Sequence, residues 1–214
     1  MIPVLIVPIL TGSDLLRRMV ASIDHEVEHL VVINNGAFVD AEELESNASR
    51  VSVINLPSNL GVAGSWNLGI KVTPFAPWWL IANFDVVWPA GSLKRWADLA
   101  PHDRLCLSGG TPPWCAFSVG EQVVADVGLF DEGFHPAYFE DNDYQHRVEH
   151  AGLTVEHTSI PVQHDNSSTL KRGYEQHNIS SFQANAHYWR TKQAAGDHSQ
   201  GSWSLDTRRR NSWD

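Results

Sequence analysis

The sequence predicts an α/β protein built on a single Rossmann-like, mostly parallel central sheet that is flanked by helices. Short apolar runs rich in β-branched residues alternate with helical patterns through the first half of the chain. Polar residues and glycines follow each run, at the strand ends where such sheets bind ligands. With 214 residues, 43% of them hydrophobic, the chain can bury a sizeable core.

The first half of the chain is expected to contain four strands separated by helices. The apolar run at residues 4–9 is too short to span a membrane and predicts a buried strand. Residues 11–14 then supply a helix start. We expect further strands at 29–33, 51–55 and 78–82, a short polar helix at 41–48, and helices at 65–71 and 92–99.

The second half is expected to mix strands with helices and to end in a long polar helix. Strands at 105–108 and 115–119 flank a loop rich in glycine and proline, and a helix at 138–151 is closed by Gly152. The other expected elements are a helix at 121–127, one or two strands within 154–164, and a C-terminal helix at 174–194.

Domain count, charge and cysteine content limit the function classes. We expect residues 1–195 to form one domain and the polar residues 196–214 to form a flexible tail. The net charge of -10 argues against nucleic acid as a default partner. Cys106 and Cys115 match no metal-binding spacing and allow at most one disulfide, which indicates a reducing compartment. With no membrane span predicted, we expect a cytoplasmic protein.

Two stretches that follow apolar runs carry candidate metal ligands. Asn83 and Asp85 lie two residues apart, so in an extended chain their oxygen atoms point to the same side, which suits a hard divalent cation. A simple turn at the strand end is the alternative. His164 opens a polar loop, residues 165–168, that could bind a metal or a diphosphate, although a structural histidine is also common.

A cluster of three carboxylates begins the helix expected at 138–151. Glu140 and Asp141 lie in its first turn, where they could cap the helix or act as a general base. Asp143 and Arg147 are four residues apart and are expected to form a surface pair.

Two further stretches have a structural and a functional interpretation. Small residues between Asn59 and Gly69 would allow either a close approach of ligand to backbone or close helix packing. Trp114 lies in a stiff loop and could stack against a sugar or belong to the core.

Taken together, these stretches resemble family 2 glycosyltransferases of the GT-A fold, which are inverting enzymes, and in particular small stand-alone bacterial or phage members. The resemblance covers residues 3 to about 168, and its most specific part is the segment 130–143. The matching pieces are Pro8 to Thr11, Asn34-Asn35-Gly36, Asn59-x-Gly61, Asn67-x-Gly69, Asn83-Phe84-Asp85, Gly128 to Phe134, Tyr138 to Asp143 with Arg147, Ala151-Gly152, and His164 with Ser167 or Ser168.

The resemblance implies a nucleoside-diphosphate sugar lying across the sheet, with a UDP-hexose favoured. Substrate-binding positions would be Pro8, Thr11 and Asn35 around the nucleoside, Asn59 and Gly61 near the base, ribose or sugar, with Asn67 and Asn83 in the matching motifs. The acceptor would be met around Trp114, Phe134, His135 and Tyr138, and could be a glycan, a protein or a modified DNA base.

The resemblance also implies a metal and a base. Asp85 would hold a divalent metal, Mn²⁺ or Mg²⁺, on the diphosphate, with His164 as a further ligand. Asp141 would be the general base, with Glu140 beside it. The chain departs from the family at Asn83, which replaces an acid, and this removes one negative charge from the metal site.

Two other readings stay open. A nucleotidyltransferase that makes sugar nucleotides would usually carry a glycine-rich basic loop near the N-terminus, and residues 11–18 match it poorly. A non-catalytic module that binds a sugar nucleotide or a carbohydrate would need the same pockets without the base.

Overall fold

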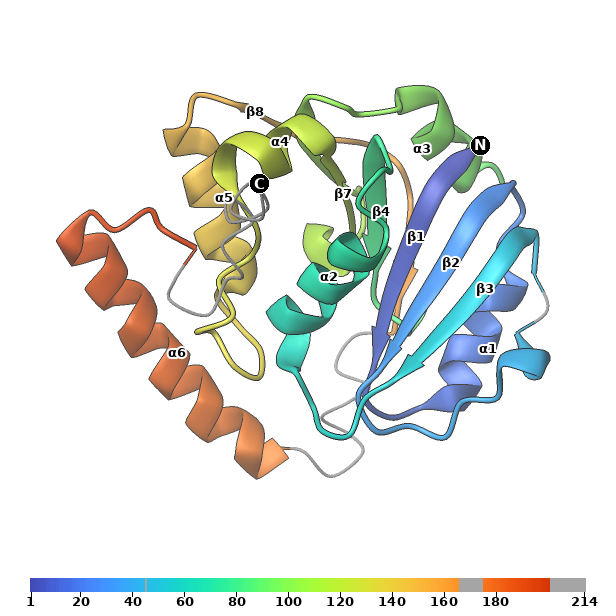
Figure 1. Cartoon of the computed structure of the whole chain (residues 1–214), viewed down its shortest axis with the longest axis horizontal. Coiled ribbons are helices and arrows are strands. Elements are labelled where there is room, and N and C mark those ends of the chain that lie inside the picture. The colour runs from blue at the N-terminus through green and yellow to red at the C-terminus, as the bar shows by residue number, and fades with distance from the viewer. Residues whose placement is uncertain (45, 166–174, 201–214) are drawn as a thin grey trace, which may run out of the picture.

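The computed structural model of the protein describes residues 1–44, 46–165 and 175–200. In these residues a seven-stranded central sheet has the strand order β3-β2-β1-β4-β7-β6-β8, and helices flank it (Figure 1). Its strands are β1 (Ile2–Ile9), β2 (Val27–Asn34), β3 (Ala48–Asn55), β4 (Trp78–Ala82), β6 (Arg104–Leu107), β7 (Ala116–Gly120) and β8 (Thr154–His157). The predicted α/β fold class is confirmed.

Most of the sheet is parallel. Strand β1 pairs in parallel with β2 and β4, β2 with β3, and β6 with β8, whereas β7 runs antiparallel to both β4 and β6. A small second sheet pairs β5 (Val86–Val87) with β9 (Gln163–His164). The helices are α1 (Ser13–Ala21), α2 (Gly61–Val72), α3 (Ser92–Leu99), α4 (Glu121–Val127), α5 (Glu140–His150) and α6 (Glu175–Ala195), with 3-10 turns η1 (Ala41–Glu43) and η2 (Pro113–Cys115).

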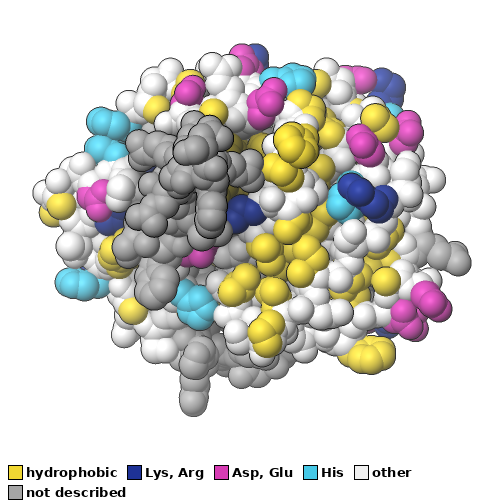
Figure 2. All heavy atoms as spheres, in the orientation of Figure 1, with side chains coloured by type: hydrophobic (Ala, Val, Ile, Leu, Met, Phe, Trp, Pro, Cys, Tyr) yellow, Lys and Arg dark blue, Asp and Glu magenta, His cyan; other side chains and the backbone are white. Residues whose placement is uncertain are grey.

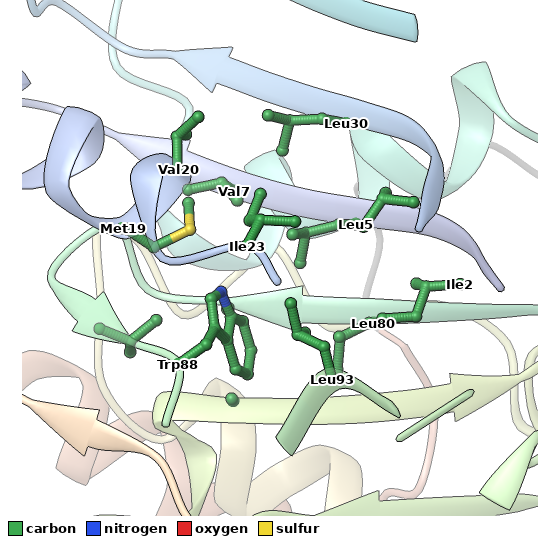
Figure 3. Packing of buried hydrophobic residues seen from close by; sticks show 14 of the residues in the cluster. Ile2, Leu5, Val7, Met19, Val20, Ile23, Leu30, Leu80, Trp88 and Leu93 are labelled. Carbon is green, nitrogen blue, oxygen red and sulfur yellow. The ribbon is translucent and has the colours of Figure 1, made fainter. Parts of the chain in front are cut away.

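Two hydrophobic clusters cover the two faces of the sheet. Alternate residues of a strand point to opposite faces, so β1 supplies Leu5 and Val7 to one cluster and Val4 and Ile6 to the other. The first cluster also takes residues of α1 and α3, and Figure 3 shows side chains of β1 and α1 packed together there. The second takes residues of α2, α4 and α5. Burial on both faces explains why the strands read as continuous apolar runs.

Several predicted boundaries are wrong, and each has a local cause. Helix α2 starts at Gly61 rather than at residue 65, because the small residues that read as a turn are its first turn. The polar helix expected at 41–48 is only the 3-10 turn at Ala41–Glu43, after which β3 begins. Helix α5 starts at Glu140, because Tyr138 and Phe139 have positive φ.

The expected surface pair of Asp143 and Arg147 is wrong, since the pair lies in the core. Their side chains are 2% and 1% exposed, with Nε of Arg147 2.8 Å from Oδ2 of Asp143. Lys192 of α6 completes the network, with Nζ 2.8 Å from Oδ1 of Asp143 and 2.7 Å from Oδ2 of Asp131. Tyr188 donates a further hydrogen bond to Asp131 at 3.0 Å. This buried network, Asp131, Asp143, Arg147, Tyr188 and Lys192, fastens α6 to α5.

The C-terminal residues that the structure describes also pack. His198 stacks on His150 with ring centroids 3.6 Å apart, and the backbone of Leu129 donates a hydrogen bond to Gln200. The predicted tail, 196–214, is thus seen only in its first residues, and 201–214 lie outside the described part of the chain.

Figure 2 shows a band of hydrophobic side chains across the middle of one face, with acidic side chains mainly toward its rim.

Cys106 and Cys115 are free and buried. The pKa of Cys106 is raised to about 12, mainly because the thiol is buried and secondly because of the negative charge of Glu156. Burial also raises the pKa of Cys115. No helix in the described ranges is long and apolar enough to cross a membrane.

Candidate active site

The candidate site lies at the end of the sheet where its parallel strands finish. Figure 1 shows α2, α5 and α6 beginning at the same end of the molecule as the arrowheads of β1, β2 and β3. Ligands of open parallel sheets bind at this end, because the loops there are free to carry polar side chains.

Asn83, Asp85 and His164 meet just beyond β4. Nε2 of His164 lies 3.1 Å from Oδ1 of Asp85 and 3.3 Å from Nδ2 of Asn83. The pairing of β5 with β9 sets this contact, since it places Val86 opposite His164. The backbone N–H of Asp165 also donates to the carbonyl of Asp85 at 3.2 Å. A local two-stranded pairing thus joins residues that are far apart in the sequence.

The electrostatics of this cluster favour a cationic group. Burial lowers the pKa of His164, but its hydrogen bond to Asp85 and the charge of that carboxylate outweigh burial, so the pKa is raised overall. Nδ1 of His164 lies 3.3 Å from the backbone oxygen of Thr111, which orients the ring. A carboxylate, an amide and an imidazole in contact supply oxygen and nitrogen ligands that a divalent ion of the manganese type accepts.

The described residues do not form a complete metal cage. Among them, no group of three or more His, Cys, Asp and Glu side chains is placed to hold a metal ion. Asp85 and His164 supply two such groups, and Asn83 supplies an amide in place of a third. An ion here would need oxygen atoms from a substrate, and the direct bond between Asp85 and His164 would open to admit it. The donor set fits a substrate-completed site rather than a structural one.

The residues predicted to line the nucleoside pocket lie at the ends of β1 and β2. Pro8 and Thr11 are half-buried. Asn35 is 7% exposed, donates to Oγ of Ser65 at 2.9 Å and accepts from the backbone N–H of Leu60 at 2.8 Å. The side chain of Asn35 therefore ties the end of β2 to the start of α2, a structural role that accounts for these hydrogen bonds.

The start of α2 packs closely against the loop before α5. Asn59 accepts a hydrogen bond from the backbone N–H of Gly61 at 2.8 Å, and the carbonyl of Pro136 accepts one from Val62 at 2.7 Å. Gly61 has φ 76°, and a Cβ there would lie 2.8 Å from the oxygen of Pro136 and 2.9 Å from Cδ2 of His135. Of the two interpretations of this glycine, the geometry supports close packing.

Asn67 lies in the core rather than on an open surface. It is fully buried, accepts from the backbone N–H of Phe130 at 2.9 Å, and donates to the carbonyl of that residue at 2.9 Å and to Glu132 at 2.7 Å. Its hydrogen-bonding capacity is used in holding the segment 130–132 to α2. Asn67 is thus a scaffold residue here, and its expected direct contact with substrate has no open face to support it.

Glu140 and Asp141 begin α5, and burial changes both carboxyl groups. Glu140 is 6% exposed, and its Oε2 has no hydrogen-bond partner among the described residues. Burial, with the charge of Asp141 as the second cause, holds the pKa of Glu140 well above its usual range. Burial also raises the pKa of Asp141. A buried acid without a partner is costly, and perturbed acids of this kind gather at functional sites.

Trp114 packs against the core and borders the cluster around His164. Its ring lies 6.4 Å from Trp66 and 4.6 Å from Phe117, centroid to centroid. Its loop also contains Thr111, whose carbonyl contacts His164. Trp114 is only partly buried, so one part of its ring packs against the core while another part stays accessible to a ligand.

The contacts bring some predicted residues together and leave others apart. Asn83, Asp85 and His164 form one group, and Asn35, Asn59 and Gly61 form another around the start of α2. Asp141 belongs to neither group by its hydrogen bond, which it accepts from the backbone N–H of Asn142 within α5. Ser167 and Ser168, which belong to the predicted motif after His164, lie outside the described residues.

Sequence reasoning missed the residues of α6 that hold the start of α5. Asn185 is 4% exposed and donates to the carbonyls of Ala137 at 2.7 Å and Tyr138 at 3.3 Å, while Lys192 binds Asp131 and Asp143. The C-terminal helix reads as polar on all sides, and no apolar stripe marks which of its polar residues are buried. The spacing of Asn185, Tyr188 and Lys192, by three and four residues, was the available signal.

Comparisons with known proteins identify the fold and not a family. No family model matches the chain, and no curated protein matches it. Solved structures do match. A mannosyltransferase, PcManGT, from Pyrobaculum calidifontis in complex with GDP-Man and Mn²⁺ is similar with a TM-score of 0.57 and 13% identity, over 73% of this chain and 54% of that one.

Two further similar structures come from other organisms. Glucosyl-3-phosphoglycerate synthase from Mycobacterium tuberculosis in complex with Mg²⁺ and UDP has a TM-score of 0.58 and 15% identity, over 80% of this chain and 74% of that one. TarS 1-349 from S. aureus in complex with UDP has a TM-score of 0.55 and 16% identity, over 75% of this chain and 59% of that one. The protein therefore has the GT-A fold of these glycosyltransferases, and it spans only about half the length of the mannosyltransferase and of the TarS fragment.

Proposed function

We propose that the protein is an inverting glycosyltransferase that moves a hexose from a nucleoside-diphosphate sugar to an acceptor hydroxyl. The observation that carries the proposal is the meeting of Asp85, Asn83 and His164 beyond β4, at the ligand-binding edge of a GT-A fold. Fold alone does not give function. At this edge the cluster adds oxygen and nitrogen atoms of the kinds that a divalent ion on a diphosphate would bind.

The donor class follows from the cluster and from the similar structures. Those structures contain GDP-Man with Mn²⁺, UDP with Mg²⁺, and UDP, so a UDP- or GDP-hexose is the expected donor. Pro8 and Thr11 lie at the end of β1, where they would border the nucleoside, with Asn35 and Asn59 shaping the pocket through the loops they hold. The acceptor is a glycan, a protein or a modified base.

Asp85 and His164 would hold a divalent metal, Mn²⁺ or Mg²⁺, with Asn83 beside it. When bound, such an ion offsets the negative charge that develops on the departing diphosphate. The hydrogen bond and the charge of Asp85 raise the pKa of His164, whereas a metal-ligating imidazole must be neutral, so binding of the ion would displace a proton from this pair. Asn83 supplies a neutral amide where an acid would bind more strongly, so we expect a weak site that depends on the donor for completion.

The transfer step requires a base, and we assign Asp141 to it. The acceptor oxygen forms a bond to the anomeric carbon as the bond from that carbon to the diphosphate oxygen breaks, and the electron pair leaves with the diphosphate. The acceptor proton passes to Asp141, with Glu140 beside it. Because burial raises the pKa of Asp141, its carboxylate is a stronger base than an exposed aspartate.

Incubation with a panel of nucleoside-diphosphate sugars and Mn²⁺ tests the proposal. We expect slow hydrolysis that releases UDP or GDP, loss of this activity in EDTA, and recovery on adding Mn²⁺. Asp85→Asn should require more Mn²⁺ than the native protein, whereas Asp98→Asn, which changes an exposed carboxylate paired with Lys94, should behave as native. Turnover that depends on added pyrophosphate, and that converts the donor into a nucleoside triphosphate and a sugar 1-phosphate, would instead indicate a nucleotidyltransferase. Binding without any turnover would indicate a non-catalytic module.

A further inference from the structure

Two consecutive aromatic residues precede the carboxylates of α5 in an unusual backbone conformation. Tyr138 has φ 80° and Phe139 has φ 72°, both in the left-handed region that non-glycine residues rarely occupy. Glycine would adopt this conformation without strain, yet the chain places two large rings here. Such strain persists only where the surroundings enforce it, and it is often found at functional sites.

Helix α6 enforces this conformation. The buried amide of Asn185 donates to the carbonyls of Ala137 and Tyr138, which fixes the turn. One turn earlier on the helix, the ring of Phe182 lies 5.3 Å from that of Tyr138 and 5.1 Å from that of Phe139. The backbone hydrogen bonds and the ring contacts together gather three aromatic side chains, Tyr138, Phe139 and Phe182, into one cluster beside the start of α5.

The aromatic cluster is open to solvent on its α6 side. Phe182 is 46% exposed, and Ile179, three residues earlier on the same helix, is 55% exposed. Farther along the helix Ala186 is 5% exposed, so the apolar side chains of α6 become more exposed toward this cluster. Tyr138 and Phe139 are half-buried. An exposed aromatic surface next to perturbed carboxylates has the composition of a ligand site rather than of a core.

We propose that Tyr138, Phe139 and Phe182 form the acceptor subsite and that the acceptor is a carbohydrate. This inference rests on the proposed glycosyl transfer. The apolar C–H face of a pyranose ring would stack on the aromatic rings, while its hydroxyl groups would reach Glu140 and Asp141, which directly follow Phe139. Stacking holds the ring in position and leaves one hydroxyl to be deprotonated by the base.

Charge and polarity favour a sugar over other flat acceptors. The chain carries a net charge of -10, and the two residues that follow the aromatic pair, Glu140 and Asp141, are both acids, so a nucleic acid backbone would be repelled. A neutral, hydroxyl-rich ring meets no such repulsion and can donate hydrogen bonds to carboxylates. These features select a neutral carbohydrate among the possible acceptors.

The test compares three variants at Phe182 with one control variant, all made in the 214-residue chain. Phe182→Ala and Phe182→Leu remove the ring, Phe182→Tyr keeps it, and Phe75→Ala is a matched control that removes a 93% exposed phenylalanine from the loop before β4. The acceptor probes are methyl hexosides and short oligosaccharides, used with whichever nucleotide sugar the native protein hydrolyses. We expect the Ala and Leu variants to raise the acceptor KM about tenfold and to leave acceptor-free hydrolysis unchanged. The Tyr variant and the Phe75→Ala control should behave as native.

A binding measurement keeps the inference testable apart from catalysis. Saturation-transfer NMR should show contact between aromatic protons of the native protein and one of the same sugars, and Phe182→Leu should abolish it while retaining the native circular dichroism spectrum. If no nucleotide sugar is hydrolysed, the proposed function fails, and the NMR arm still decides whether the cluster binds sugar. An unchanged acceptor KM in the Ala and Leu variants would overturn the inference. Peptides or oligonucleotides acting as acceptors in place of sugars would do the same.

Discussion

The ammonium group of Lys192 lies 2.7 Å from the carboxylate of Asp131, and both side chains are at most 2% exposed. This pair joins the C-terminal helix to the segment 130–132, which leads through a short loop into Glu140 and Asp141. A second carboxylate, Asp143, lies 2.8 Å from the same nitrogen. Lys192 thus contacts two buried acids at once, shares Asp143 with Arg147, and links α6 to the start of α5.

Replacing Lys192 by methionine should strongly destabilise the protein. The change keeps most of the side-chain volume but leaves Asp131 without its cation, and loss of one partner from a buried ion pair costs about 3–5 kcal/mol. Urea unfolding followed by circular dichroism measures the loss. As a control, Lys94→Met removes an exposed lysine paired with Asp98 and should leave the unfolding midpoint unchanged. The double change Lys192→Met with Asp131→Asn should recover part of the loss, and a native midpoint in the single variant would contradict the network.

Gly61→Ala should cost more stability than Gly91→Ala, although both glycines have nearly the same positive φ. Their φ angles are 76° and 77°, so an alanine pays the same conformational penalty of about 1 kcal/mol at each. A Cβ at residue 61 would also lie 2.8 Å from the carbonyl of Pro136, whereas nothing lies within 4 Å of one at residue 91. Thermal unfolding of the two variants side by side isolates the steric part. Equal melting temperatures would show that the start of α2 can move away from residues 135–136.

Glu140→Gln should stabilise the protein at neutral pH. Burial raises the pKa of Glu140, so the folded state holds its proton more tightly than the unfolded state does. The free energy of unfolding therefore falls as the pH rises from the unfolded pKa through the folded one. Glutamine removes this penalty, and a gain of about 1 kcal/mol would raise Tm by about 2–4 °C. The gain at pH about 7.5 should shrink toward pH about 4.5, and a gain that is equal at both values would refute the explanation.

Asp141→Asn should abolish transfer while donor binding survives. An amide cannot accept the acceptor proton, and a general base contributes roughly 10²–10⁴-fold to rate. Rates with the native donor, together with calorimetric titration of UDP or GDP, separate the two effects. For the native protein, burial raises the pKa of Asp141, so its activity should decline on acidification at a pH above the ordinary range of aspartate. Near-native turnover of the variant would remove Asp141 from the role of base.

The sequence predicted the fold where local signals and burial agree. The ranges expected for β4, α3 and α4 match the structure, because β4 ends before the polar Asn83, α3 ends shortly before Pro101, and α4 ends before Gly128. The start of α5 was placed too early, because Tyr138 and Phe139 look like helix residues and only the contact with α6 forces their positive φ. Likewise, the spacing of Asp143 and Arg147 reveals the pair but not the helix that buries it.

The candidate site was predictable only in part, because several of its features depend on contacts between elements that are distant in the sequence. The resemblance grouped Asp85 with His164 as metal ligands; β5 and β9 bring the two side chains into contact, and their shared role at a metal stays a prediction. It could not show that the side chains of Asn35 and Asn67 form hydrogen bonds with neighbouring protein segments, because these bonds depend on how α2 packs. The aromatic cluster forms only when Phe182 of α6 packs against Tyr138 and Phe139. The hydrophobic periodicity of the sequence does not indicate which side of α6 faces α5.

The two buried thiols have a practical consequence for watching this protein at work. Burial raises the pKa of both Cys106 and Cys115, so neither presents a thiolate to reagents at neutral pH. A fluorophore carried by maleimide would therefore attach to a single cysteine introduced at the exposed position Gln183, with no need to delete the native pair. The dye would sit beside Phe182 and would report in real time whether the C-terminal helix shifts when a sugar arrives.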